Sequence, residues 1–316
     1  MVKETAERLA TAIERAVIGR RAEVEALLAA FLADGHVLLE GPPGTAKTLV
    51  VRLLAAASGC AFRRVQFTPD LMPADVVGTH VYDPRDGSFR LSRGPVFADV
   101  LLADEINRAP AKTQAALLEA MEERRVTIDG ETLPLPRPFT VFATMNPIEF
   151  EGTFPLPEAQ LDRFLMKIRM GPIDAASERR VIAQAAGGFD PWASAERETP
   201  AVLDPSRLVE LRAAVRRIRV DEAVQAYLVD VVRRTRSHPA VAFGASTRAG
   251  VALLRVCQAR AACQGREFVV PDDVKALAPP VLSHRIGLTP EAQVEGADGS
   301  QVIARILQEA PVPRAA

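Results

Sequence analysis

Gly41-Pro42-Pro43-Gly44-Thr45-Ala46-Lys47-Thr48 is a glycine- and proline-rich stretch between a short apolar run, residues 36–39, and a helix-like segment, residues 47–57. The apolar run is typical of a buried strand. In such a strand–loop–helix unit, glycines let backbone N–H groups point at an anion, a lysine binds the β and γ phosphates of a nucleotide, and a threonine hydroxyl binds Mg²⁺. We therefore interpret the stretch as a phosphate-binding loop that uses Lys47 and Thr48, with nucleotide contacts extending to Leu49.

Ala46 departs from the usual form of this loop, in which glycine precedes the lysine. A methyl group is tolerated at that position when the residue has helical φ and ψ, so we expect a helical backbone at Ala46. The alternative interpretation of the stretch is a strand-to-helix turn with an incidental lysine. The strand pattern before it and the helix pattern after it favour the phosphate-binding loop.

Two further apolar runs end in polar residues that suit a nucleotide-hydrolysing site. Residues 100–103 precede Asp104, which can hold Mg²⁺ through water, and Glu105, which can accept a proton from an attacking water. Residues 139–143 precede Asn146, whose neutral amide can hydrogen-bond that water or the γ-phosphate. The alternatives are a solvated acid for Glu105 and a turn-forming residue before proline for Asn146. The phosphate-binding loop upstream favours the catalytic roles.

The pattern along the chain predicts an α/β domain followed by a helical one. Helix-like segments, notably 47–57 and 111–124, separate several strand-length apolar runs, which are residues 36–39, 62–67, 100–103, 139–143 and 165–168. This alternation predicts an αβα sandwich with a mostly parallel five-stranded sheet, covered on both faces. Beyond residue 172 the pattern is helical, so we expect a core domain over 1–172, a small all-α domain over 173–316, and a linker around 187–205.

Two segments of the first domain have the pattern of exposed hairpins. In residues 126–133, alternating residues flank Asp129-Gly130, a dipeptide favoured in type I′ turns because both central residues need positive φ. Residues 79–92 contain suitable turn residues but a longer loop, which leaves the register of that hairpin open.

Composition and charge exclude several classes of protein. The 316 residues include 39 basic and 40 acidic side chains, a net charge of −1, which argues against a nucleic-acid-coating protein and against a disordered acidic chain. Cys60, Cys257 and Cys263 lack the spacing of a disulfide framework or a zinc site. The N-terminus is charged and no run approaches ~18 apolar residues, so we expect an unexported chain in the reducing cytoplasm.

With the three strand-end motifs in this order, the sequence resembles the AAA+ ATPases, and in detail the MoxR branch of that superfamily. Besides GPPGTAKT, the resemblance rests on four strings, LLADEINRAP (101–110), ATMNP (143–147), EGTFPLPEAQLDRF (151–164) and GASTRA (244–249). It implies that the first domain is an AAA+ ATPase core with Walker A and Walker B motifs, that the second is a lid, and that ATP and Mg²⁺ bind. It also implies a ring, usually a hexamer, with ATP at each subunit interface.

The resemblance assigns roles to individual residues as well. It implies that Val17, Ile18 and Gly19 lie against adenine and that Asn146 is the sensor-1 residue. The two hairpins correspond to the helix-2 insert and the pre-sensor-1 hairpin, which such proteins direct toward the pore of the ring or toward partners.

Two arginines, Arg163 and Arg248, match the arginine finger and the sensor-2 residue of that family. A guanidinium aimed at charge developing on the γ-phosphoryl group is worth roughly 10³ to 10⁵ in rate, and an arginine supplied by a neighbouring subunit makes hydrolysis depend on assembly. The alternatives are an ion pair within the chain for Arg163 and a lid-surface charge for Arg248. Whether Arg248 acts on its own subunit's nucleotide or on a neighbour's is open. Arg108 either reaches across the interface or forms an ion pair at the entry to the following helix.

The function that the resemblance implies is an ATP-driven chaperone that remodels, matures or activates a client protein complex. Such proteins often help to insert a metal or cofactor, typically with a separate partner that carries a von Willebrand factor A domain. One alternative is the ATPase subunit of a magnesium chelatase, and another is a nucleotide switch that barely hydrolyses ATP, which the presence of Glu105, Asn146 and Arg163 disfavours.

A nucleic-acid motor or loader of the same superfamily is a further alternative. It would need a basic surface, for which the candidates are Arg212, Arg216, Arg217, Arg219, Arg233, Arg234 and Arg236. Few aromatic residues are interleaved with these arginines, and the net charge is near zero. Both observations make nucleic acid the weaker choice of partner.

Overall fold

The computed structural model describes residues 1–147, 153–195 and 199–313. Its centre is a five-stranded sheet made of β1 (Val37–Glu40), β2 (Phe62–Gln66), β5 (Val100–Asp104), β8 (Thr140–Met145) and β9 (Met166–Arg169). The order across the sheet is β2-β5-β8-β1-β9, and every neighbouring pair is parallel. The predicted sheet is therefore confirmed, and it is parallel throughout rather than mostly parallel.

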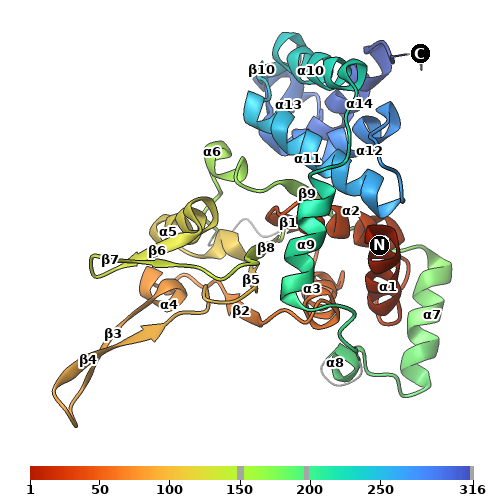
Figure 1. Cartoon of the computed structure of the whole chain (residues 1–316). Helices are drawn as coiled ribbons and strands as arrows, with labels where there is room; N and C mark the ends of the chain where they lie inside the picture. Colours follow the sequence, from red (N-terminus) through yellow and green to blue (C-terminus); the bar gives the residue numbers. More distant parts are fainter. Residues whose placement is uncertain (148–152, 196–198, 314–316) are drawn as a thin grey trace.

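Helices cover both faces of this sheet (Figure 1). On the face toward which Leu39 points, the core is shared with three helices, α1 (Val2–Glu14), α2 (Arg21–Leu32) and α3 (Lys47–Ala57). The neighbouring Leu38 points the other way, into a core shared with α5 (Ala111–Glu123). Successive side chains of a strand alternate between faces, so strands covered on both sides appear in the sequence as unbroken apolar runs. The predicted αβα sandwich is confirmed.

Two antiparallel hairpins extend from the sandwich, and both were predicted. Their strand pairs are β3 (Gly78–Asp83) with β4 (Ser88–Arg93), and β6 (Arg125–Ile128) with β7 (Glu131–Pro134). The turn between β6 and β7 has φ 50° at Asp129 and φ 88° at Gly130, both positive as a type I′ turn requires. Figure 1 shows the β3–β4 hairpin reaching away from the rest of the molecule. The short elements of this half are α4 (Pro73–Val77), η1 (Ile106–Arg108) and α6 (Glu158–Leu161).

The C-terminal part is mainly helical. Its helices are α7 (Ala175–Ala186), α8 (Pro191–Ala193), α9 (Pro205–Val215), α10 (Glu222–Ser237), α11 (Thr247–Cys263), α12 (Pro271–Leu282), η3 (Ser283–Arg285), α13 (Pro290–Val294) and α14 (Gly299–Glu309). A pair of very short strands, β10 (Val241–Phe243) and β11 (Gly287–Leu288), was not predicted, because two or three residues are too few to show a pattern. Among the described helices, none is long and apolar enough to cross a membrane.

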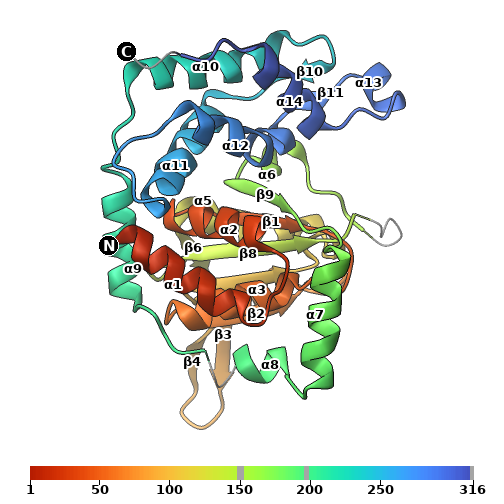
Figure 2. The same cartoon turned by 90° about the vertical axis from the view of Figure 1, so that its right-hand side faces the viewer.

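Figure 2 shows α10–α14 stacked above the sheet, whereas α9 lies beside α1. A buried arginine, Arg212, connects α9 to residues that precede it in the α/β sandwich. Its guanidinium donates to the carbonyl oxygen of Phe31 at 3.1 Å and to Oγ1 of Thr140 at 2.8 Å, and it forms an ion pair with Asp34. Arg212 is therefore a structural residue and cannot contribute to a basic surface. The domain boundary near residue 172 stays a prediction.

Candidate active site

The phosphate-binding loop, Asp104, Glu105 and Asn146 lie around a single cavity of about 450 Å³. The loop follows β1, the two carboxylates follow β5, and Asn146 follows β8, which lies between those two strands in the sheet. Because the carboxyl ends of parallel strands lie at one edge of a sheet, three separate sequence motifs converge there. The cavity is lined by Pro43, Gly44, Thr45, Ala46, Lys47, Thr48, Leu49, Arg64, Asp104, Glu105, Thr144, Asn146 and Trp192.

Two glycines of the loop fit a phosphate cradle for different reasons. A Cβ atom at Gly41 would lie 2.2 Å from the carbonyl oxygen of Met170, so close packing admits glycine alone. A Cβ atom at Gly44 would meet no heavy atom within 4 Å, and φ there is +80°. Gly44 thus supplies a left-handed turn beside open cavity space. Lys47 lies along the loop, with its Nζ donating to the carbonyl oxygens of Gly41 at 2.6 Å and Pro42 at 2.8 Å.

The expected helical backbone at Ala46 is wrong. Ala46 has φ 66° and ψ 21°, which is the left-handed region, and α3 begins only at the next residue. The loop therefore makes at Ala46 the turn for which glycine is usually required, with an alanine in its place. The departure from the usual sequence therefore places backbone strain in the loop.

The oxygen atoms beside Lys47 suit a magnesium ion. Oγ1 of Thr48 donates to Oδ2 of Asp104 at 3.3 Å, so a hydroxyl and a carboxylate face one another. Asp104 also accepts from Oγ1 of Thr144 at 2.5 Å and from Nε of Arg64 at 2.9 Å. Hydroxyl and carboxylate oxygens are the ligands that Mg²⁺ prefers, so Thr48 and Asp104 fit this ion.

Glu105 is held by three neighbours. Its backbone N–H donates to Oγ1 of Thr144 at 2.9 Å, and its Oε2 accepts from Nε2 of Gln66 at 2.7 Å and from the guanidinium of Arg108 at 3.1 Å. Arg108 thus forms an ion pair within its own chain, the second of the two possibilities left open by the sequence. Gln66 and Arg64 were missed as site residues. Their spacing of two on β2 places both side chains on one side of a strand, but that spacing alone does not identify a site.

Trp192, which was not predicted as a site residue, lines the cavity of the phosphate-binding loop. The guanidinium carbon of Arg52 lies 5.9 Å from the centre of its ring. Trp192 belongs to α8, a helix of three residues, and its position depends on how the chain returns from α7 to α9. No local sequence pattern could have placed it there.

Val17, Ile18 and Gly19 line a different cavity, of about 480 Å³. They lie close to the chain that leaves β9, because Arg20 donates from its guanidinium to the carbonyl oxygen of Gly171 at 2.5 Å. The segment that follows β9 also contacts the phosphate-binding loop, since the carbonyl oxygen of Met170 lies against Gly41. The predicted adenine residues are therefore neighbours of the phosphate-binding loop but do not line its cavity.

Arg163 and Arg248 are brought together, away from the loop of their own chain. Both line a third cavity, of about 440 Å³, and both form an ion pair with Glu122 at the end of α5. Nε of Arg163 lies 3.0 Å from Oε2 of Glu122, and a guanidinium NH group of Arg248 lies 3.0 Å from Oε1. Glu122 was not predicted, because its partners come from a turn and a lid helix that are remote in the sequence.

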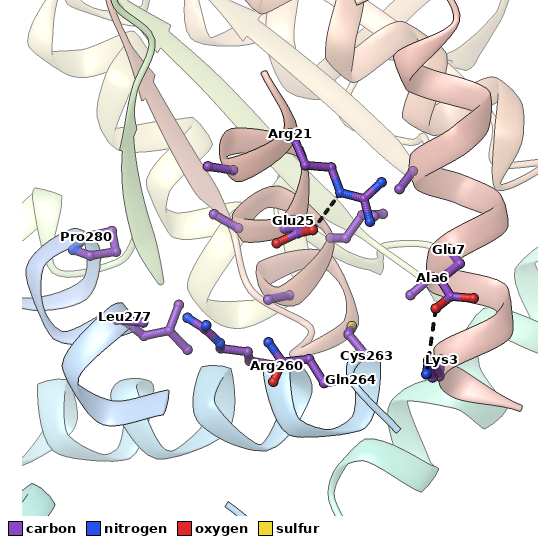
Figure 3. Close-up of a pocket in the computed structure, with 16 residues that line it drawn as sticks. Lys3, Ala6, Glu7, Arg21, Glu25, Arg260, Cys263, Gln264, Leu277 and Pro280 are labelled. Carbon is purple, nitrogen blue, oxygen red and sulfur yellow. Dashed lines mark hydrogen bonds and ion pairs between the residues drawn. The ribbon is translucent and has the colours of Figure 1, made fainter. Parts of the chain in front are cut away.

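A fourth cavity, of about 500 Å³, lies where α1 and α2 meet α11 and α12 (Figure 3). Its lining includes several alanines, and most of its charged residues form ion pairs within the lining, as Arg21 does with Glu25 and Lys3 with Glu7. None of the predicted site residues lines it. This cavity lies between the N-terminal helices and the lid, beside their shared apolar packing, and is not part of the site.

Comparisons with known proteins agree with this arrangement. Residues 36–166 match the model of the ATPase family associated with various cellular activities, and residues 233–306 match the AAA lid domain. The chain is 45% identical to the uncharacterized protein YeaC of Bacillus subtilis over 95% of this chain and 92% of that one. It is 43% identical to Chaperone MoxR1 of Mycobacterium tuberculosis over 98% and 83%, and 34% identical to Protein MoxR of Methylorubrum extorquens over 98% and 96%.

A crystal structure of a protein from Cytophaga hutchinsonii superposes with a TM-score of 0.90 at 39% identity, covering 99% of this chain and 96% of that one. Fold, lid and near full-length relatives lead to the same assignment. This chain belongs to the MoxR family of AAA+ ATPases.

Proposed function

We propose that this protein hydrolyses ATP and uses the energy to remodel or activate a client protein complex. The observation that carries the proposal is the single cavity shared by Lys47, Asp104, Glu105 and Asn146. A phosphate-binding lysine, a metal-binding carboxylate, a second carboxylate and a neutral amide are the groups that hydrolysis of a nucleoside triphosphate requires.

Each group in the cavity has a distinct part in this proposal. Backbone N–H groups of Gly44, Thr45 and Ala46 and the ammonium of Lys47 bind the phosphates. Thr48 and Asp104 hold Mg²⁺, which neutralises charge on the β and γ phosphates when bound. Glu105 accepts the proton of the attacking water after its contacts with Gln66 and Arg108 are released, and Asn146 orients that water. Adenine binds beside Val17, Ile18 and Gly19.

We propose further that the protein works as a homo-oligomeric ring, a hexamer, in which both arginines act on the nucleotide of a neighbouring subunit. Arg163 and Arg248 line one cavity, and the loop that contains Lys47 lines another. Their sharing of Glu122 supports a joint role. In this proposal residues 1–172 form the ATPase core and residues 173–316 form the lid.

The client side of the proposal rests on the relatives and on the hairpins. One relative is named Chaperone MoxR1. The β3–β4 hairpin extends from the molecule and carries two exposed aromatic rings, Tyr82 and Phe89, whose centres are 5.4 Å apart. Exposed aromatic side chains suit contact with another polypeptide. We place the protein in the cytoplasm, where it acts in maturation of a complex, by metal or cofactor insertion, with a von Willebrand factor A domain partner.

The test is ATP turnover by the purified chain across a range of protein concentrations. We expect the rate per subunit to rise with concentration, because hydrolysis needs an arginine from a second copy. Glu105→Gln and Arg163→Ala should each lower the rate at saturating ATP by roughly 10²-fold or more. A rate per subunit that is independent of concentration and unchanged in Arg163→Ala would overturn the proposal of a shared site.

A further inference from the structure

Glu122 binds the two arginines through separate oxygen atoms. Oε2 lies 3.0 Å from Nε of Arg163, and Oε1 lies 3.0 Å from the guanidinium of Arg248. The three side chains come from different elements, which are the end of α5, the turn after α6 and the start of α11 in the lid. All three are partly exposed, with 40% of Glu122, 28% of Arg163 and 53% of Arg248 accessible to solvent.

Two other arginines of this cavity, Arg285 and Arg124, have structural partners, and Arg255 also lines it. Arg285 is buried and binds Asp162 at 2.6 Å together with the carbonyl oxygens of Phe164 and Leu165. Arg124 donates to the carbonyl oxygen of Phe139 and pairs with Asp34. Asp162 therefore satisfies Arg285 first, and it lies at a longer distance, 3.7 Å, from Nε of Arg248.

What remains for Arg163 and Arg248 is the carboxylate of Glu122. Two guanidinium groups this close would repel one another, and a shared anion removes that repulsion. A carboxylate offers two oxygen atoms to two donors, as a terminal phosphate does, but it carries less charge. A phosphate that entered this cavity would be the stronger partner for both arginines.

We infer that Glu122 occupies, in the single subunit, the place that the γ-phosphate of a neighbouring subunit's nucleotide takes in the ring. Glu122 is in this view a positioning residue. It holds Arg163 and Arg248 at a common point, and it must be displaced before they can reach the neighbour's nucleotide. Glu122 therefore opposes assembly of the ring until the neighbour's nucleotide is a triphosphate. The inference rests on the proposed function, because it requires that the two arginines serve a neighbour.

The same ion pair connects the lid to the core. Arg248 is the second residue of α11, and Glu122 is the residue before the last of α5. Displacement of Glu122 by a phosphate would therefore release one lid-to-core contact in the same step in which the arginines engage the neighbour. Binding at one subunit interface would loosen the lid of the subunit that supplies the arginines.

The test uses Glu105→Gln as the parent, because this substitution is expected to slow hydrolysis so that ATP persists during the measurement. Sedimentation velocity over a protein dilution series with saturating MgATP gives the concentration at half assembly. We expect Glu122→Gln in this parent to lower that concentration by about 3- to 10-fold, the effect of removing competition from two partly exposed ion pairs. With MgADP in place of MgATP, Glu122→Gln should change the concentration at half assembly only slightly.

The matched control is Glu119→Gln, which removes the same charge one turn earlier from an exposed position of α5. It should leave the assembly midpoint unchanged. Glu122→Asp keeps the charge on a shorter side chain and should fall between the parent and Glu122→Gln. Adding Arg163→Ala to Glu122→Gln should abolish the decrease in the assembly midpoint, because the arginine released by the loss of Glu122 is then missing.

An assembly midpoint that rises, or that stays at the level of the Glu119→Gln control, would overturn the role assigned to Glu122 while leaving the shared site intact. A parent that does not assemble with ATP at any concentration would overturn the shared site and this inference together. Circular dichroism of the single-subunit form checks that Glu122→Gln is folded. If Glu122→Gln is not folded, Glu122→Asp is measured in its place. An assembly midpoint of Glu122→Asp equal to that of the parent would then contradict the inference.

Discussion

Ala46 turns the loop into α3 with a left-handed backbone, at φ 66° and ψ 21°. This region costs an L-residue roughly 1–2 kcal/mol relative to the right-handed one. Glycine adopts it without that cost, although it also has more freedom in the unfolded chain, which offsets part of the gain. We expect Ala46→Gly to raise the free energy of unfolding by about 0.5–1 kcal/mol, measured by urea denaturation.

A matched substitution separates backbone strain from the general effect of glycine. Ala115 is exposed in the right-handed interior of α5, so Ala115→Gly should lower the free energy of unfolding by about 0.5–1 kcal/mol. The two alanine-to-glycine changes are thus expected to have opposite signs. A lower free energy of unfolding in both variants would show that the backbone at position 46 is not strained.

Single residues could be predicted from the sequence where the sheet itself brings them together. Lys47, Asp104 and Asn146 follow three strands that are neighbours in a parallel sheet, and the order of motifs along the chain was enough to place them around one cavity. Glu122 could not be predicted in this way. Its contact with Arg248 depends on how α11 packs on the N-terminal helices, and neither side chain has a spacing that identifies the other.

The two hairpins show which elements local chemistry can determine. The β6–β7 turn was predictable because Asp129-Gly130 favours positive φ at both central positions, and the structure has that turn. By contrast, α8 has three residues, too few for a helical period, so neither this element nor the position of Trp192 beside the loop could be inferred. Elements are predictable from the sequence when their own residues, rather than their neighbours, determine the backbone.

The β6–β7 hairpin should therefore be sensitive to the backbone preference of its turn. Gly130 has φ 88°, and a Cβ atom there would meet no heavy atom within 4 Å, so Gly130→Ala tests strain without a steric clash. We expect the free energy of unfolding to fall by about 0.5–1 kcal/mol in a urea titration. Gly171→Ala is the control, since its Cβ atom would also meet nothing and its φ is outside the left-handed region. Equal effects at both positions would contradict the interpretation.

At the scale of the whole molecule, the lid and the core are joined by shared apolar packing. One cluster of buried side chains runs from α1, α2 and α3 through α9 to α10, α11 and α12. The sequence predicted that a helical part follows the sheet, but it contained no information on which helices of the core that part would cover. That choice depends on the fit of two apolar surfaces, which a periodic pattern does not specify.

Two buried histidines connect distant parts of this packed unit. Nδ1 of His36 accepts from the backbone N–H of Val141 at 2.9 Å, and its Nε2 lies 3.1 Å from the carbonyl oxygen of Met121. Nε2 of His284, in the lid, lies 3.1 Å from the carbonyl oxygen of Phe164. Burial lowers the pKa of His36 to about 3 and the pKa of His284 well below its usual value. Both imidazoles are therefore neutral in the folded protein near neutral pH.

These lowered pKa values make the stability of the molecule depend on pH below about 6.5. In the unfolded chain each histidine is protonated as the pH falls through about 6.5, whereas in the folded protein both stay neutral far below that pH. The unfolded state then binds more protons, so the stability present above pH 6.5 is lost as the pH falls toward about 3, the folded pKa of His36. Each histidine should contribute a slope of about 1.4 kcal/mol per pH unit.

Replacing one histidine should remove its share of this slope. We expect His36→Gln to lower the free energy of unfolding at pH 7, because it disturbs a buried pair of hydrogen bonds, and to reduce the pH slope between pH 6 and 4 by about one proton. Urea titrations at a series of pH values give both quantities. Between pH 7 and 8 the variant and the parent should run parallel, since position 36 is then uncharged in both states. If the two slopes are equal below pH 6, the proton uptake of the unfolded chain has another source than His36, and the neutral imidazole does not determine the acid stability of the fold.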